Sequence, residues 1–202
     1  MSSSRLRLDR VLVDRGLAPT RSSARALIMA GKVRLANQSE CKAGTLVNVD
    51  TSIEVIQLPR FVSRGGDKLA AAINKSGINV TGRTCLDIGA STGGFTDALL
   101  QTGASTVISV DVGYGQLSWE LRQDNRVFVL ERTNARYLTI DDLPTSLNTP
   151  PTILVIDVAF ISARKILPAV GQVCAPACDA IVLVKPQFES RPDRIGARGI
   201  VT

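Results

Sequence analysis

The sequence of 202 residues contains no histidine. A Ser-His-Asp or Cys-His catalytic group is therefore excluded, and so is zinc held by imidazole ligands. Any proton transfer would have to use lysine, aspartate, glutamate, tyrosine or cysteine. We expect no metal site.

Cysteine is scarce, with residues Cys41, Cys85, Cys174 and Cys178 and no Cys-x-x-Cys pair. This usage is typical of a reducing cytoplasmic compartment. Cys174 and Cys178 are predicted to lie one helical turn apart, close enough to touch. We expect them to be small buried apolar residues, not a metal or redox pair.

Long apolar runs are also missing. The first ten residues, MSSSRLRLDR, are basic, but no apolar segment follows them, so a secretory signal is not expected. No stretch approaches the roughly 18 apolar residues of a membrane-spanning helix. The sequence therefore predicts a cytoplasmic protein without a membrane partner.

The positive charge is concentrated in one part of the chain. The whole sequence has 24 basic and 18 acidic residues, and residues 1–68 hold 12 of the basic and 6 of the acidic ones. The remainder is balanced. A basic segment joined to a neutral globular one predicts a polyanionic partner for the first part.

The first sixty residues have the pattern of a small α+β fold. Helices are predicted over Leu6–Arg15, ended by Gly16, and over Arg21–Ala30, capped by Thr20 and ended by Gly31. Strands are predicted at Lys32–Leu35, Thr45–Val49 and Ile53–Val55, with a turn at Asn37–Ser39.

Six basic residues of this segment fall outside its apolar pattern, which predicts contacts with RNA phosphates: Arg7, Arg10, Arg21, Arg25, Lys32 and Arg34. A solvated charged face is the alternative. No aromatic residue precedes Phe61, so recognition by base stacking is disfavoured and recognition of folded RNA is favoured.

Residues 5–57 resemble the S4-like RNA-binding domain. The resemblance is carried by RLDRVLVDRGLAPTRSSARALIMAGKVRL and by the spaced apolar residues from Val47 to Val55. It implies that the two helices and the loop before the first strand contact RNA.

From Arg83 onward, short apolar runs alternate with helical segments. The predicted strands are Thr84–Ile88, Val107–Asp111, Val127–Leu130, Ile153–Asp157 and Ala180–Val184, and the predicted helices are Phe95–Gln101, Gln116–Gln123 and Ala163–Val173. This alternation predicts a Rossmann-like, doubly wound α/β domain. Such sheets bind ligands at the carboxyl ends of their strands.

A glycine-rich loop follows the first of these strands. Its pattern, D-x-G-x-x-x-G-G from Asp87, departs from the dinucleotide fingerprint because position 91 is serine, and it lacks the lysine of a P-loop. It matches the first motif of S-adenosylmethionine-dependent methyltransferases. The cofactor-binding residues predicted from this loop are Asp87, Gly89, Ala90, Ser91, Gly93 and Phe95.

Two residues after later strands complete the predicted cofactor site. Asp111 ends the next strand, where a carboxylate can accept hydrogen bonds from a ribose diol. Asn134 follows the third strand and is predicted to approach the adenine edge.

Three charged residues are the catalytic candidates. Asp157 and Lys185 each end an apolar strand at the ligand edge, and Lys68 lies in Ser63–Lys68 just after the basic segment. An ordinary exposed charge is the alternative for each. Together they would suit methyl transfer to a ribose hydroxyl. A lysine can remove the hydroxyl proton if burial and a neighbouring cation lower its pKa from about 10.4. A sulfonium methyl donor requires no metal.

The segments VSRGGDKL, DIGASTGGFTDALL, VDVGYGQL, DVAFIS and LVKPQFE resemble the TlyA family. That resemblance implies an S4-like domain over residues 1–57, a linker over 58–63 and an FtsJ-like methyltransferase domain over 64–202. It further implies S-adenosylmethionine as cofactor, methylation of cytidine ribose 2′-hydroxyls in ribosomal RNA of the ribosomal subunits, and a role for the linker in coupling cofactor to RNA.

The resemblance assigns Lys68, Asp157 and Lys185 to a Lys-Asp-Lys-Glu catalytic set, in which the family glutamate and the last strands come after Thr202. We therefore expect an incomplete domain with five strands. Ala159 stands where the family usually has serine, and Glu189 is not at the position of the family glutamate. The alternative functions are an rRNA-binding protein with impaired catalysis and a membrane-active protein, since the family also carries the label haemolysin.

Overall fold

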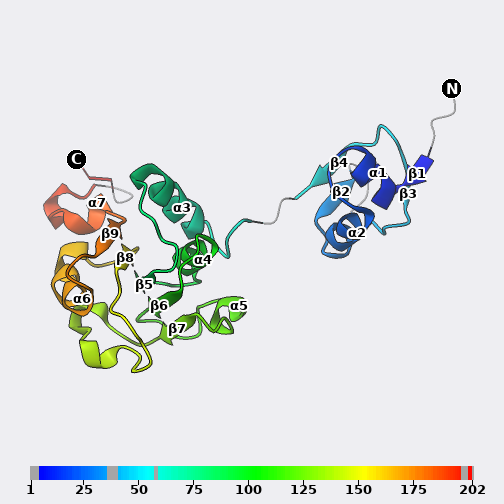
Figure 1. The fold of residues 1–202 in the computed structure, drawn as a ribbon. Coiled ribbons are helices and arrows are strands. Elements are labelled where there is room, and N and C mark those ends of the chain that lie inside the picture. Colours follow the sequence, from blue (N-terminus) through cyan, green and yellow to red (C-terminus); the bar gives the residue numbers. More distant parts are fainter. Residues whose placement is uncertain (1–4, 36–40, 57–58, 197–199, 202) are drawn as a thin grey trace. The chain divides into compact units, whose positions relative to one another are not determined.

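A computed structural model describes residues 5–35, 41–56, 59–196 and 200–201. The chain divides into two compact units, Met1–Leu58 and Pro59–Thr202 (Figure 1). The turn predicted at Asn37–Ser39 and the first linker residue, Leu58, lie outside the described residues.

The N-terminal unit packs two short helices on two small antiparallel sheets. Its elements are β1 (Arg5–Arg7), α1 (Leu8–Asp14), α2 (Arg21–Met29), β2 (Val33–Leu35), β3 (Leu46–Asn48) and β4 (Ile53–Val55), with β1 paired to β3 and β2 to β4. Thr20 caps α2 as predicted, because its hydroxyl accepts a hydrogen bond from the Ser23 N–H at 3.1 Å. Gly16 and Gly31 have φ of +70° and +66° and follow the two helices, also as predicted.

The predicted start of the first helix at Leu6 is wrong. Arg5 to Arg7 are extended and Leu6 pairs with Val47, so the helix begins only at Leu8. The alternation of apolar Leu6 and Leu8 with arginines fits a strand as well as a helix, and pairing with β3 decides the outcome.

The second unit is a five-stranded parallel sheet of order β7-β6-β5-β8-β9. Its strands are β5 (Thr84–Ile88), β6 (Thr106–Val110), β7 (Val127–Leu130), β8 (Ile153–Ile156) and β9 (Asp179–Val182). Its α-helices are α3 (Gly65–Ser76), α4 (Gly94–Gln101), α5 (Trp119–Arg122), α6 (Leu167–Val173) and α7 (Pro186–Glu189), and its short 3₁₀ turns are η1 (Ala135–Tyr137), η2 (Ile140–Asp142), η3 (Ala163–Lys165) and η4 (Pro192–Arg194). The Rossmann-like α/β prediction is thus confirmed.

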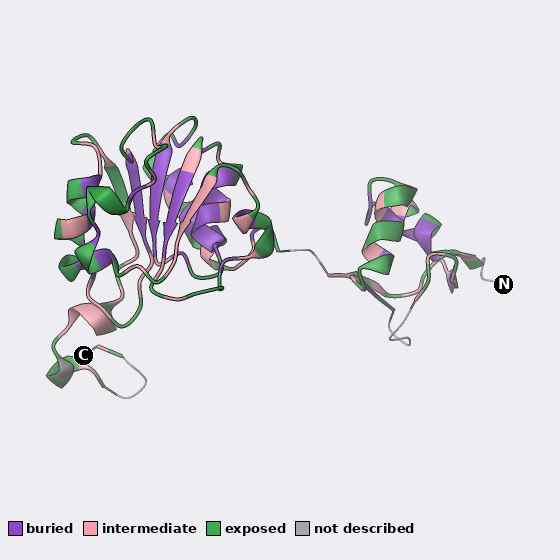
Figure 2. Cartoon of the chain, turned by 90° about the horizontal axis from the view of Figure 1, so that it is seen from below, coloured by how far each residue is buried: buried purple, intermediate pink, exposed green. Residues whose placement is uncertain are grey.

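Apolar residues alternate between the two faces of this sheet. Along β5, Cys85 belongs to the core beneath α3 and α4, whereas Leu86 and Ile88 belong to the core beneath α6. Both faces are therefore covered, and the central strands β5, β6 and β8 are buried while the outer faces of the helices are exposed (Figure 2).

Four segments differ from the sequence-based expectation. The helix α3 was not predicted, because it begins with two glycines, Gly65 and Gly66, which disfavour helix. The helix expected from Gln116 begins only at Trp119, and a 3₁₀ turn precedes α6 where one helix from Ala163 was expected. The strand β9 ends at Val182, so Lys185 lies beyond the strand.

The prediction that Cys174 and Cys178 lie one helical turn apart is wrong. The helix α6 ends at Val173, and Cys174 is already extended. The two thiols still interact, and both are partly buried. Burial raises the pKa of Cys174 to about 12, and that of the fully buried Cys85 also to about 12.

Candidate active site

The candidate site lies where the parallel strands β5 and β8 end side by side. The loop after β5 begins with Gly89, which has a φ of +84°. A side chain there would place its Cβ 2.7 Å from the backbone oxygen of Asp157, the residue after β8. Glycine at this position therefore lets the glycine-rich loop and Asp157 meet, as the ligand edge of a doubly wound sheet requires.

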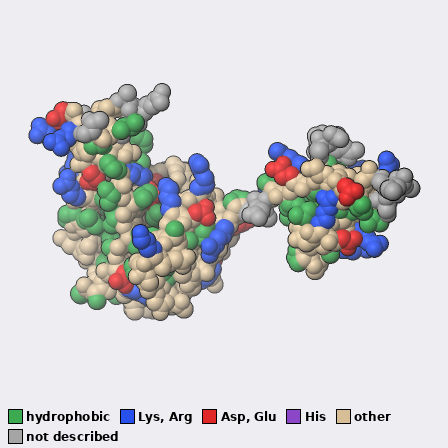
Figure 3. Space-filling view, turned by 90° about the horizontal axis from the view of Figure 1, so that it is seen from above, with side chains coloured by type: hydrophobic (Ala, Val, Ile, Leu, Met, Phe, Trp, Pro, Cys, Tyr) green, Lys and Arg blue, Asp and Glu red, His purple; other side chains and the backbone are tan. Residues whose placement is uncertain are grey.

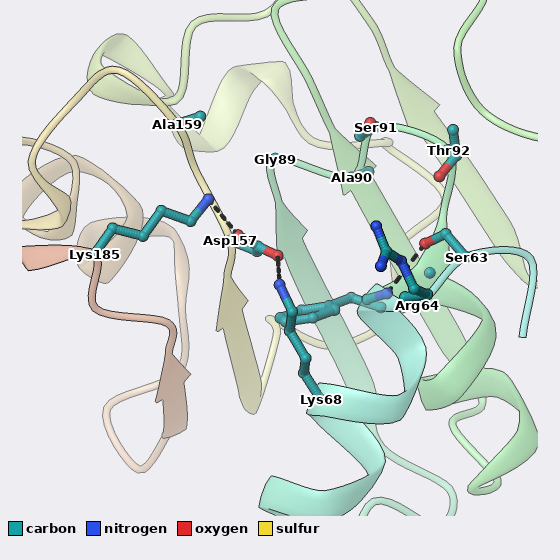
Figure 4. A pocket seen from close by; sticks show the side chains of 13 residues that line it. Ser63, Arg64, Lys68, Gly89, Ala90, Ser91, Thr92, Asp157, Ala159 and Lys185 are labelled. Carbon is teal, nitrogen blue, oxygen red and sulfur yellow. Dashed lines mark hydrogen bonds and ion pairs between the residues drawn. The ribbon is translucent and has the colours of Figure 1, made fainter. Parts of the chain in front are cut away.

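Asp157 lies between the two predicted lysines. The Lys185 ammonium forms an ion pair with Asp157 Oδ1 at 2.6 Å, and the Lys68 ammonium lies 4.0 Å from Oδ2 (Figure 4). The side chain of Asp157 is 19 % exposed and that of Lys185 is 24 % exposed, whereas Lys68 is 56 % exposed. The three residues predicted from separate segments thus form one cluster.

Each member of the cluster is fixed by its own element. Asp157 continues β8, and its N–H donates to the Ile88 carbonyl at 3.0 Å. Lys185 precedes Pro186, which holds its backbone extended at φ −110° and ψ 101°. Lys68 is in the first turn of α3, so the unpredicted helix is what carries it to the sheet edge.

This cluster lies in a pocket of about 640 Å³, the first pocket. Its lining residues are Ser63, Arg64, Gly65, Lys68, Gly89, Ala90, Ser91, Thr92, Gly94, Phe95, Asp157, Ala159 and Lys185. Four of the predicted cofactor residues, Gly89, Ala90, Ser91 and Phe95, are therefore in its wall.

A second pocket of about 530 Å³ shares Gly89, Ser91, Asp157 and Ala159 with the first. It contains Asp111 and Asn134, the two residues predicted after later strands. The N–H groups of Ser91 and Gly113 donate to the two oxygens of Asp111 at 2.8 and 2.7 Å and fix its carboxylate. The Asn134 side chain caps η1 by accepting from the Arg136 N–H at 3.1 Å.

Two predicted loop residues have structural contacts. A Cβ at Gly93 would overlap Leu121 Cδ1, so this glycine permits packing of the loop on α5. Asp87 is fully buried and accepts a hydrogen bond from the Thr96 hydroxyl at 2.7 Å. Burial, together with the nearby charges of Asp157 and Asp111, raises the pKa of Asp87 to about 7, although the hydrogen bonds from Thr96 oppose the shift.

In the N-terminal unit, three of the predicted RNA-binding arginines surround one carboxylate. Arg7 and Arg25 each lie 3.1 Å from Asp9, and Arg21 lies at 3.3 Å. Asp9 is fully buried, whereas the three arginines are about half exposed. The arginine contacts hold the pKa of Asp9 well below its usual range.

Of the other predicted RNA-binding residues, Arg10 and Arg34 are exposed and Lys32 is partly buried, and Arg10 pairs with Asp14 at 3.4 Å. In Figure 3, basic and acidic side chains alternate over the face of this unit that is in view. Asp9 therefore holds three of the predicted arginines in one fixed group. The periodicity of the sequence did not predict this group.

Some site residues were missed by the sequence-based reasoning. Arg64 lines the first pocket, and Gln116 and Thr133 line the second. The position of Thr133, three residues beyond the end of β7, was an available signal. No such signal was available for Arg64, because its position depends on α3 and on the packing of Phe61. Phe61 is 3 % exposed in the core of this unit.

Within the described ranges, no three acidic or cysteine side chains lie close enough together to hold a metal ion. The helices of those ranges include none that is both long and apolar enough to cross a membrane.

The fold and the edge site define a methyltransferase of the α/β class. Residues 61–202 match the model of the FtsJ-like methyltransferase family, and residues 6–53 match the S4 domain. The chain belongs to the TlyA family, whose combination of domains it has.

Three similar proteins illustrate the relationship. The 16S/23S rRNA (cytidine-2′-O)-methyltransferase TlyA of Mycobacterium tuberculosis is 47 % identical over 98 % of this chain and 73 % of its own length. Hemolysin A of Brachyspira hyodysenteriae is 38 % identical over 97 % of this chain and 80 % of its own length. A solved structure named "Putative hemolysin from Streptococcus thermophilus" has a TM-score of 0.68 and 40 % identity, and the match covers 100 % of this chain and 73 % of that one.

Proposed function

We propose that this protein transfers a methyl group from S-adenosylmethionine to the ribose 2′-hydroxyl of a cytidine in ribosomal RNA. The observation that carries the proposal is the Lys68–Asp157–Lys185 cluster at the boundary of two joined pockets. The second pocket suits a methyl donor and is called the donor pocket, and the first suits the methyl acceptor and is called the acceptor pocket. The rRNA and cytidine specificity is taken from the activity named for the relative from Mycobacterium tuberculosis.

The donor pocket has groups that fit S-adenosylmethionine. The Asp111 carboxylate is held by two backbone N–H groups and keeps lone pairs free for a ribose diol. Val112, Ala135 and Ile166 provide apolar walls for an adenine ring, and Asn134 supplies an amide at its edge. When bound, S-adenosylmethionine would supply an electrophilic sulfonium methyl group.

The residues of the acceptor pocket suit the removal of a proton from a hydroxyl. A lysine that is neutral when the hydroxyl arrives can accept its proton, while the second lysine stays cationic and favours that neutral form. Asp157 orients both ammonium groups from one carboxylate. Because Lys185 is the less exposed of the two lysines, we assign it the base role and Lys68 the cationic one. The 2.6 Å contact with Asp157 fixes the position of the Lys185 nitrogen.

The N-terminal unit would hold the RNA. Arg7, Arg21 and Arg25 form a fixed cationic group on Asp9, and fixed guanidinium forks suit phosphate oxygens. Arg10, Lys32 and Arg34 would add further phosphate contacts. An rRNA substrate within ribosomal subunits places the protein in the cytoplasm.

The test of catalysis is transfer of a labelled methyl group to unmethylated ribosomal subunits by the 202-residue chain. We expect Asp157→Ala and Lys185→Ala each to lower the transfer rate at least about 100-fold, which is the usual contribution of a general base. Binding of S-adenosylmethionine, measured by calorimetry, should survive in both variants. A wild-type chain that binds the cofactor and rRNA without transferring label would contradict the proposal and favour a binding-only protein.

The matched control is Lys75→Ala. Lys75 is in the last turn of α3, the helix that also carries Lys68, and it is exposed. We expect this variant to transfer label at the wild-type rate, so that loss in the other variants cannot be attributed to charge alone.

A further inference from the structure

The segments that carry Asp157 and Lys185 are joined by one carboxylate outside the catalytic cluster. Glu189 ends α7, one turn after Lys185. Its Oε2 accepts a hydrogen bond from the Ser162 hydroxyl at 2.5 Å, and its Oε1 accepts one from the Ala163 N–H at 2.7 Å. Ser162 and Ala163 belong to the segment that leaves β8 through Asp157, so Glu189 connects the two loops.

Further contacts support the same connection. Arg164 forms an ion pair with Glu189 Oε2 at 3.4 Å and donates to its backbone carbonyl at 3.3 Å. The rings of Phe160 and Phe188, one from each segment, lie with centroids 5.5 Å apart. The Glu189 side chain is 19 % exposed, whereas Arg164 is 78 % exposed, so the partly buried contacts to Ser162 and Ala163 are the principal ones.

The turn between Glu189 and Lys185 is short and stiff. Pro186 fixes the first helical residue, the Phe188 N–H donates to the Lys185 carbonyl at 2.8 Å, and the Ser190 N–H donates to the Pro186 carbonyl at 2.9 Å. A displacement at Glu189 would therefore move the backbone of Lys185. The side chain of Lys185 reaches Asp157 from that backbone (Figure 4).

We propose that Glu189 is a positioning residue: its carboxylate holds the segment after β9 on the segment after β8 and thereby keeps the Lys185 ammonium on Asp157. This inference rests on the function proposed above for the Lys68–Asp157–Lys185 cluster. Glu189 acts through Lys185 and is not itself assigned to the chemistry.

The first test uses Glu189→Gln. Glutamine keeps the shape but has only one acceptor oxygen, so it can accept from Ser162 or from Ala163 but not from both, and it loses the ion pair with Arg164. We expect kcat for methyl transfer to fall at least about 10-fold with the KM for S-adenosylmethionine within about twofold, because a misplaced catalytic group lowers rate more than cofactor affinity. An unchanged kcat in the folded variant would overturn the proposal.

A second readout does not depend on methyl transfer. We expect acetic anhydride to acetylate Lys185 severalfold faster in Glu189→Gln than in the wild type, measured by peptide mass spectrometry with Lys75 as internal reference. The ion pair with Asp157 shields Lys185 in the wild type. An equal acetylation rate would overturn the proposal. If the wild type transfers no methyl group, the proposed function fails, and this measurement still decides the role of Glu189.

Two further variants control for folding and charge. Ser162→Ala removes one of the two buried hydrogen bonds and should change both readouts in the same direction, by a smaller factor, even if Glu189→Gln fails to fold. Asp193→Asn removes an acid that follows α7, is 66 % exposed and is paired with Arg191. This variant should leave both readouts unchanged. Equal effects of Glu189→Gln and Asp193→Asn would show that charge loss alone is responsible and would overturn the proposal.

Discussion

Asp87 shows how a single buried side chain makes stability depend on pH. It lies under the glycine-rich loop, and its Oδ1 has no hydrogen-bond partner among the described residues. Its pKa is about 7 in the folded protein, raised from an ordinary value of 3.8. Between these values the folded state binds more protons than the unfolded state. The contribution of Asp87 to the free energy of unfolding is therefore complete below pH 4 and is lost as the pH rises through 7.

We predict that the free energy of unfolding of the wild type falls between pH 4 and 7 relative to that of Asp87→Asn. Over this range, the free energy of unfolding of the wild type should fall by at most about 4 kcal/mol more than that of Asp87→Asn. Urea unfolding at several pH values measures it. Asparagine also changes the stability at every pH, so only the slopes are compared. Parallel curves for the two proteins would refute the assignment.

At the scale of elements, the approach of α3 to α4 places Lys68 in the site. A Cβ at Gly94, the first residue of α4, would overlap Ser63 Oγ and lie 2.9 Å from the Gly66 backbone nitrogen. The serine side chain can rotate, but the backbone of α3 has to move.

We therefore predict that Gly94→Ala is destabilised by about 1–3 kcal/mol, as expected for overpacking, and transfers methyl groups more slowly because Lys68 shifts. The matched control is Gly171→Ala in α6, where a Cβ meets nothing within 4 Å. That variant should be unchanged or about 0.5–1 kcal/mol more stable, because alanine suits a helix interior better than glycine. Thermal unfolding and transfer rates check both, and equal melting temperatures would contradict the packing argument.

The elements also show what could be predicted from the sequence. The five strands were predicted because each is a run of apolar, mostly branched residues, and Asp111 and Asp157 were placed at the edge because each follows such a run. The helix α3 was not predicted, since Gly65 and Gly66 give no helical signal. The grouping of arginines around Asp9 depends on tertiary packing, which no local pattern reports.

At the scale of the whole molecule, the protein combines an RNA-binding unit and a methyltransferase unit. The two family matches, 6–53 and 61–202, fall on either side of the boundary between the two compact units. The predicted domain ranges, 1–57 and 64–202, stay predictions in their exact limits. Phe61, predicted as linker, packs in the core of the second unit, a contact that no local sequence pattern predicts.

The most direct measurement is the identity of the methylated nucleoside. Ribosomal RNA from unmethylated subunits would be incubated with the full chain and S-adenosylmethionine, digested to nucleosides and analysed by mass spectrometry. The account predicts 2′-O-methylcytidine with the wild type and none with Asp157→Ala. A methyl group on a base, or label that persists in Asp157→Ala, would contradict the assignment of the Lys68–Asp157–Lys185 cluster to ribose methylation.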